Sequence, residues 1–169
     1  MRFPITPCNR RHLINLLQSW RLYLQGRPIQ LTADEEEARR LAFPNLPPRK
    51  VLQVLNIGFW TTDETGERLF ERGKHVDRVS LIIRGRVRVS RDERVIVELV
   101  AGDIVGSALN MTGVPADVDA LVVEPVRAIS WEVGSLERYL AANLETRITM
   151  LNHLYRDFAG KIGLLSKTR

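Results

Sequence analysis

The sequence predicts an α+β protein in which an antiparallel β-roll, a jelly-roll type of sheet, is flanked by helices on both sides. Three observations lead to this prediction. Short apolar stretches with period-two alternation, separated by glycine turns, fill the chain from residue 79 to residue 107. Residues 9–55 carry apolar side chains at helical spacing instead. The chain from residue 144 onward does so again.

The N-terminal part, residues 1–58, contains three predicted helices. In residues 9–25, leucines and a tryptophan recur three and four positions apart, with arginines available for the other side. Two interpretations of this amphipathic helix stay open: peripheral contact with an anionic membrane surface, or packing on the β-roll of the same chain. A capping box starts a second helix at Thr32, and Pro44 ends it; a proline pair opens a third helix that ends at Gly58.

The β-roll is predicted to occupy residues 59–133. Residues 79–83 form an apolar run that contains one polar residue, Ser80, and Gly85 interrupts it. Residues 86–89 then alternate arginine with valine, which places the valines on one face and the arginines on the other. We therefore expect a strand that is buried on one side and solvated on the other. Further strands are expected at 95–99, 118–123 and 126–131, with the last two joined by a Glu-Pro turn.

The C-terminal part, residues 134–169, is predicted to be helical. A short helix from Ser135 to Leu140 precedes a longer one that starts at Leu144. Seven apolar residues of the longer helix are spaced alternately four and three apart, which is the heptad pattern of a coiled coil. They are Leu144, Ile148, Leu151, Tyr155, Phe158, Ile162 and Leu165. A period close to 3.5 favours a homodimer through this row over packing within one chain.

Composition limits the number of domains and the cellular setting. With 169 residues, 44% of them hydrophobic and 27% charged, the chain suits one well-buried domain. Its single cysteine, Cys8, excludes an intramolecular disulfide, and neither a long apolar run nor a secretory leader is visible. We expect a soluble, cytoplasmic protein, with membrane association left to the helix at 9–25.

Several function classes lack support in the sequence. The net charge of +5 comes from dispersed arginines without interleaved aromatic residues, so the prediction is a solvated face and no nucleic-acid partner. No helix-turn-helix pattern follows the β-roll. The histidines at 12, 75 and 153 are scattered, and nucleophile and phosphate-loop motifs are missing. We expect a protein that is not an enzyme and that holds no metal or cofactor.

Residues 66–132 resemble the β-roll of cyclic nucleotide-binding domains. The resemblance rests on an Ile-Ile-x-Gly-Arg-Val-x-Val strand pair, a Gly-Asp turn and a following Val-Gly. Within that superfamily, residues 27–55 are similar to the stretch that leads into the β-roll of popeye-domain proteins. The resemblance implies a non-enzymatic regulatory or sensor domain that binds a cyclic nucleotide and signals through a dimer helix.

The segment that would hold the ligand's phosphate departs from the family pattern. Family members use backbone amides, a glutamate on the ribose and an arginine on the phosphate. Here the glutamate position is Ser107 and the arginine position falls on Asp117, so we expect weak or absent binding of cyclic AMP. The popeye motifs Asp-Ser-Pro-Glu and Phe-Gln-Val-Thr are replaced by Gly-Ser-Ala-Leu and Val-Asp-Ala-Leu. The candidate ligand-binding residues are Gly106, Ser107, Ala108, Leu109, Asp117, Val118 and Asp119.

Two functions therefore remain after the sequence is considered. In the first, the roll binds a cyclic nucleotide or a similar small ligand and reports it through the C-terminal helix. In the second, the phosphate segment is degenerate and the domain serves only dimerisation or protein interaction. The sequence does not decide between them.

Overall fold

The computed structural model describes residues 30–106 and 115–165, with side chains placed up to residue 156. The contacts divide the chain into Met1–Gln30 and Leu31–Arg169, and the second unit contains the elements that follow. The predicted helix at 9–25 lies outside the described residues. So do Ser107, Ala108 and Leu109.

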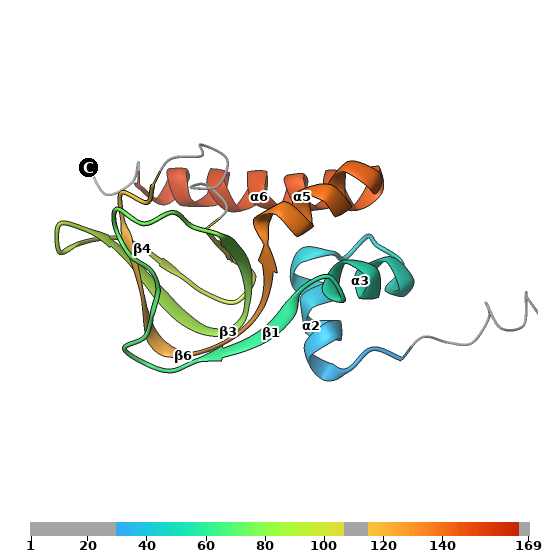
Figure 1. The fold of residues 1–169 in the computed structure, drawn as a ribbon, viewed down its shortest axis with the longest axis horizontal. Helices are drawn as coiled ribbons and strands as arrows, with labels where there is room; N and C mark the ends of the chain where they lie inside the picture. Colours follow the sequence, from blue (N-terminus) through green and yellow to red (C-terminus); the bar gives the residue numbers. More distant parts are fainter. Residues whose placement is uncertain (1–29, 107–114, 166–169) are drawn as a thin grey trace, which may run out of the picture. The chain divides into compact units, whose positions relative to one another are not determined.

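Two helices precede the sheet and two follow it (Figure 1). In chain order the elements are α2 Ala33–Ala42, α3 Pro48–Leu55, β1 Phe59–Asp63, β2 Arg68–Phe70, β3 Arg78–Arg91, β4 Arg94–Leu99, β5 Ile104–Val105, β6 Asp119–Glu132, α5 Val133–Ala142 and α6 Leu144–Leu165. The predicted α+β class with an antiparallel β-roll and flanking helices is confirmed.

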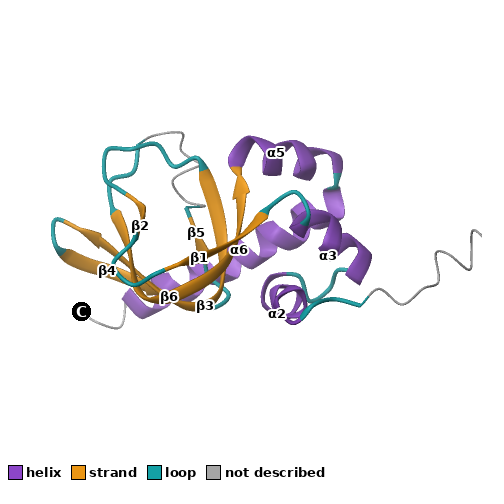
Figure 2. Ribbon diagram, turned by 60° about the horizontal axis from the view of Figure 1, so that its bottom comes forward, coloured by secondary structure: helices purple, strands orange, loops and turns teal. Residues whose placement is uncertain are grey.

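The sheet is antiparallel and has six strands. Its order is β1-β6-β3-β4, with β2 on β6 and β5 on β3. The long strands β3 and β6 curl, so that the sheet encloses an interior, while α2, α3 and α5 gather at one end (Figures 1 and 2). The roll thus has an inner face and an outer face that meets helices.

Both long strands continue where the sequence predicts breaks. β3 runs through Gly85, and β6 runs through Pro125, which we expected to lie in a turn between two strands. Gly85 has φ +92°, and a Cβ there would lie 2.1 Å from the Pro125 carbonyl oxygen. The register shifts at this point, and such irregularities tolerate both glycine and proline in a strand.

Two apolar clusters share strand β3. Leu81 and Ile83 face the helices, whereas Ile82 and Val87 face the interior of the roll. This burial on both faces explains the apolar run at 79–83. Trp131 is fully buried, and its Nε1–H donates to the Val54 carbonyl at 2.8 Å, which joins α3 to β6.

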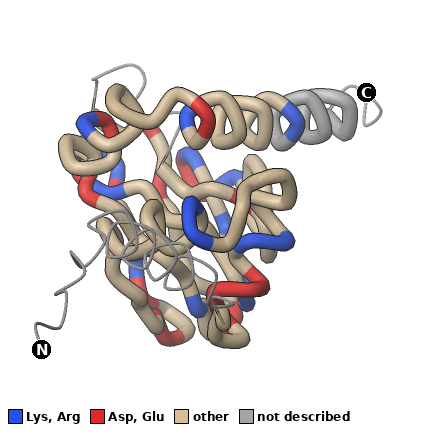
Figure 3. Tube along the Cα trace, turned by 90° about the vertical axis from the view of Figure 1, so that its right-hand side faces the viewer, with Lys and Arg blue, Asp and Glu red and all other residues tan. Residues whose placement is uncertain are grey.

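Arg86 and Arg88 of β3 lie on the outer face, as the alternation predicts. Arg86 and Arg88 contact Glu98 at 3.2 Å and 2.9 Å. The hydrogen bond from Arg88 is the main reason that the pKa of Glu98 is below its usual range. Arg84 and Arg127, which are cross-strand neighbours, both pair with Asp34 of α2. Figure 3 shows basic and acidic residues interspersed along the described trace.

The C-terminal helices differ slightly from the expectation. α5 begins at Val133, before Ser135, whose side chain does not cap it, because the N-cap residue is Glu132. α6 begins at Leu144 as predicted. Of the seven-residue row, Leu144, Ile148 and Tyr155 are 67%, 49% and 70% exposed. Among the helices that the structure describes, none is long and apolar enough to cross a membrane.

Candidate functional site

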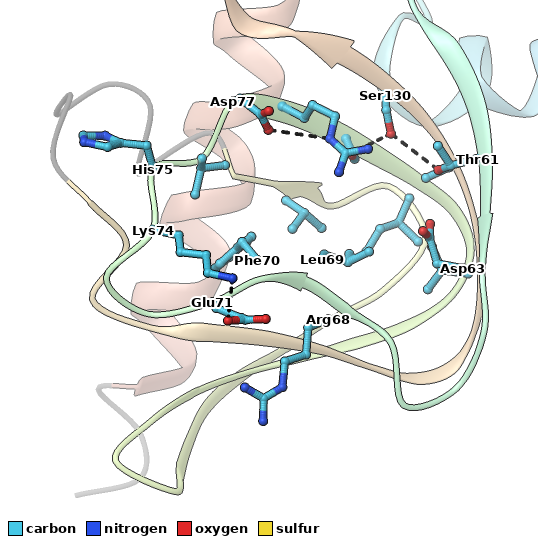
Figure 4. A pocket seen from close by; sticks show the side chains of 17 residues that line it. Thr61, Asp63, Arg68, Leu69, Phe70, Glu71, Lys74, His75, Asp77 and Ser130 are labelled. Carbon is cyan, nitrogen blue, oxygen red and sulfur yellow. Dashed lines mark hydrogen bonds and ion pairs between the residues drawn. The ribbon is translucent and has the colours of Figure 1, made fainter.

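The interior of the roll contains a cavity of about 230 Å³. Strands β1, β2, β3, β5 and β6 and the segment 71–78 contribute to its wall (Figure 4). Its apolar lining consists of Leu69, Phe70, Val76, Ile82, Val105, Val126 and Ala128. Its polar lining consists of Thr61, Asp63, Arg68, Glu71, Lys74, His75, Asp77, Arg78, Ser80 and Ser130. A pocket with this lining suits a small ligand that has both apolar and charged parts.

The cations on the cavity wall differ in how they are engaged. Lys74 pairs with Glu71 at 2.9 Å, and this hydrogen bond lowers the pKa of the Glu71 carboxyl. In Figure 4 the guanidinium of Arg68 and the ring of His75 point away from the cavity. Among the residues that the structure describes, Arg78 makes an ion pair with Asp77 alone, its neighbour in the chain, at 3.6 Å. Arg78 is therefore the cation best placed to meet an anionic ligand.

Three hydroxyl groups form a row across the neighbouring strands β1, β6 and β3. The Ser130 Oγ lies 2.8 Å from the Ser80 Oγ and 3.4 Å from the Thr61 Oγ1 (Figure 4). Ser130 is only 3% exposed, although Val126 and Ala128 on the same face of β6 are apolar. Buried hydroxyls need hydrogen-bond partners, and this row supplies them to one another.

The two ends of the segment that the family uses for phosphate are held at the rim of this cavity. At one end, Gly106 has φ +88°, and a Cβ there would lie 2.7 Å from the Arg78 carbonyl oxygen. At the other end, the Ala116 carbonyl accepts from the Gly73 amide at 2.8 Å, and the Ala116 amide donates to the Lys74 carbonyl at 2.9 Å. Residues 73–78 therefore connect both ends to the charged wall.

The described candidates from the sequence do not gather in the cavity. Asp117 is absent from its lining, and its carboxylate forms an ion pair with Arg91 at an exposed position. Val118 is buried in the apolar interior. The Asp119 carboxylate accepts a hydrogen bond from the Arg72 amide at 3.1 Å. The repulsion that we expect from Asp117 stays a prediction, and the position of its side chain argues against it.

The cavity instead contains residues that sequence reasoning missed. Arg78 and Asp63 lie at strand ends beside turn residues. Charged side chains are common at such positions, so their presence there does not indicate a binding site. Ser80 interrupts an apolar run and Ser130 another. Periodicity assigns both serines to a buried face, and a polar residue at such a position could have indicated the row of hydroxyl groups.

A second cavity, of about 160 Å³, lies between the roll and helices α5 and α6. Apolar side chains form most of its lining, including Ile104, Leu136, Met150 and Leu151. Strands β3 and β5 separate the two cavities, since Ser80 and Val105 line the first and Val79 and Ile104 the second. A change in the first cavity thus crosses a single layer of strands before it reaches the helices.

The comparisons with known proteins agree with this architecture. The model of the cyclic nucleotide-binding domain family matches residues 63–143. This segment belongs to the cyclic nucleotide-binding domain superfamily. The match does not distinguish the popeye-like subtype, to which the sequence analysis assigned the chain, from other members of this superfamily. No curated protein sequence matches the chain.

Several solved structures share the fold. A cyclic nucleotide-binding domain from Methylobacillus flagellatus KT is 20% identical with a TM-score of 0.70, over 81% of this chain and 86% of that one. A Ruegeria pomeroyi DSS-3 protein, named provisionally for cyclic nucleotide binding, is 22% identical with a TM-score of 0.60 over 80% of this chain. The cAMP-bound PfPKA-R is 17% identical with a TM-score of 0.63 over 79% of this chain. The match spans 62% of the Ruegeria protein and 45% of PfPKA-R.

Proposed function

We propose that this domain is a non-enzymatic, popeye-like regulatory receptor whose roll cavity binds a cyclic nucleotide or a similar small anion. The observation that carries the proposal is the position of Arg78, a weakly paired cation on the cavity wall beside Gly106. The cAMP-bound state of PfPKA-R, which has the same fold, supports this class of ligand. The phosphate segment is non-standard, because the family's arginine position holds Asp117 and that side chain pairs with Arg91.

The charge balance favours a monoanion in this cavity. Its lining contains three basic and three acidic side chains besides His75, so an anionic ligand binds where a basic side chain is only weakly paired. The Asp77 side chain is 89% exposed and Arg78 is half-exposed, and an ion pair of this kind contributes little. A cyclic phosphate would replace it with a charge-assisted hydrogen bond, worth about 1.5–3 kcal/mol. Arg78 then takes the role of the phosphate-binding arginine, which is absent at position 117.

Replacing Arg78 by glutamine tests this proposal directly. We expect the Kd for cyclic AMP and other cyclic nucleotides, measured by titration calorimetry, to rise about tenfold to a hundredfold, because one charge-assisted bond is lost. Arg86→Gln is the matched control: Arg86 pairs with Glu98 on the outer face, so its Kd should equal that of the unaltered protein. Equal affinity of both variants contradicts the assignment of Arg78. Absence of binding by the unaltered protein favours the degenerate dimerisation module.

A hydrogen bond connects the cavity wall to α6. The Nε2–H of His153 donates to the Gly102 carbonyl at 2.7 Å. The turn that contains Gly102 is in turn bonded to Ile82, which lines the cavity: the Gly102 amide donates to the Ile82 carbonyl at 2.9 Å, and the Ile82 amide donates to the Asp103 carbonyl at 3.0 Å. We infer that ligand binding reaches α6 through this turn and the adjoining strand β5.

Removal of the imidazole should weaken this connection. For His153→Ala we expect amide hydrogen exchange in α6 to accelerate about twofold to tenfold, because one net hydrogen bond is lost. The effect of a bound cyclic nucleotide on that exchange should shrink as well, since coupling between two sites is reciprocal. Asn152→Ala, an exposed change on the same helix, is the control. Unchanged exchange in His153→Ala speaks against this route.

The exposed row on α6 supports the dimer part of the proposal. Leu144, Ile148 and Tyr155 project from one side of the helix without cover from their own roll. Large apolar side chains exposed in a row are typical of an interface. We propose that two copies meet through this row and that α6 transmits the ligand signal across the dimer. Peripheral membrane contact through residues 9–25 is a further expectation of the same proposal, for a domain that works in the cytoplasm.

A further inference from the structure

Asp63 is the one acid on the cavity wall whose role the proposed function leaves open. It ends strand β1, lines the cavity and is half-buried. Its carboxylate has neither an ion pair nor a hydrogen bond with any residue that the structure describes. The other two acids of the lining, Glu71 and Asp77, pair with Lys74 and Arg78. A carboxylate on a cavity wall without a partner among these residues is available to accept a hydrogen bond from a ligand.

The turn after β1 does not need Asp63. An aspartate at such a position often accepts hydrogen bonds from the amides of the turn. Here the Glu64 amide donates to the Glu67 carboxylate at 3.1 Å, and the Gly66 amide donates to the Val122 carbonyl at 2.9 Å. Other groups thus satisfy these turn amides, and the Asp63 side chain is left to the cavity.

Asp63 and Arg78 lie at opposite ends of one wall. Strands β1 and β3 flank β6, where Asp63 is paired with Val126 and Arg78 with Glu132. The row of Thr61, Ser130 and Ser80 crosses the wall between them, since Thr61 precedes Asp63 by two residues on β1 and Ser80 follows Arg78 by two on β3. A ligand along this wall meets a cation at one end, hydroxyls in the middle and a carboxylate at the other end.

This order of groups matches a cyclic nucleotide with an amino group on its base. With the phosphate at Arg78, the base extends towards Asp63, and a carboxylate there accepts only from an N–H donor. Adenine and cytosine carry an exocyclic amino group where hypoxanthine and uracil carry a carbonyl oxygen. The three hydroxyls use two protons for their mutual bonds, which leaves one donor for the ligand. We propose that Asp63 selects cyclic nucleotides whose base bears an amino group.

Two nucleotide pairs that differ at this group and in the proton on the adjacent ring nitrogen test the inference, which rests on the proposed function. We expect cyclic AMP to bind about tenfold to a hundredfold more tightly than cyclic IMP, and cyclic CMP more tightly than cyclic UMP by a similar factor. Asp63→Asn should remove or invert both preferences, because an amide side chain also donates. Titration calorimetry of both proteins with all four nucleotides gives these ratios. Thermal unfolding of Asp63→Asn, compared with that of the unaltered protein, shows whether the variant folds.

The outcomes separate this inference from the proposed function. Arg78→Gln should weaken all four nucleotides by the same factor and leave both ratios unchanged, since the phosphate is common to them. Two outcomes would overturn the role of Asp63 alone. In the first, binding depends on Arg78 but is equally tight with and without the amino group. In the second, the affinity ratios persist in Asp63→Asn. If none of the four nucleotides binds the unaltered protein, the proposed function and the selection by Asp63 both fail.

Discussion

Replacement of Trp131 by alanine is expected to lower the free energy of unfolding by about 3–5 kcal/mol, the largest stability effect that we predict for a single side chain. Trp131 is fully buried and belongs to the cluster that joins the roll to the helices. Its indole also donates to the Val54 carbonyl at 2.8 Å. The alanine variant loses the packing and leaves a carbonyl without its donor. Urea denaturation followed by circular dichroism measures the change.

A second substitution separates packing from hydrogen bonding. Trp131→Phe keeps much of the apolar volume but removes the N–H, so it should cost about 1–3 kcal/mol from the unpaired Val54 carbonyl and a further amount from lost volume. Trp60, which is only partly buried and lies under Arg127 at 5.0 Å, supplies the control. If Trp60→Ala destabilises the domain more than Trp131→Ala does, our account of how the helices attach to the roll is wrong.

Lysine at both Ile148 and Tyr155 is expected to convert a two-fold dimer of this chain into monomers. Both side chains are exposed in the single chain, so the charges cost little there. In the proposed coiled coil they would place four ammonium groups in an apolar interface without partners, and buried unpaired charge is strongly destabilising. Light scattering of the full chain should show the mass halved.

The position of Leu151 explains the choice of residues. Leu151 belongs to the predicted heptad row but also lines the apolar cavity under α5, so changing it would disturb the monomer. Glu93→Lys is the control, because this exposed residue lies in a turn outside α6 and the change adds the same two units of charge. Should the control also dissociate, net charge rather than the row is responsible. A parent protein that is already monomeric removes the dimer from the proposed function.

Much of the architecture followed from local sequence patterns. Period-two alternation at 86–89 separated the buried valines from the solvated arginines, because successive side chains of a strand point to opposite faces. The capping box at Thr32 placed the start of α2, since its hydrogen bonds join residues only three apart. The heptad row placed the start of α6 at Leu144, because its spacing also relates residues only three or four apart. Local periodicity and capping require no knowledge of distant partners.

The content of the cavity depended on long-range register instead. Arg78, Ser130 and Asp63 share a wall because β6 pairs with both β3 and β1, and no local pattern encodes which residues then stand opposite one another. Pro125 stays within β6 because Gly85 of the neighbouring strand leaves room for its carbonyl. The resemblance leads us to expect Asp117 at the family's arginine position, whereas its side chain pairs with Arg91. The sequence by itself determined that a β-roll forms, whereas strand pairing in the tertiary structure decided which charges face its interior.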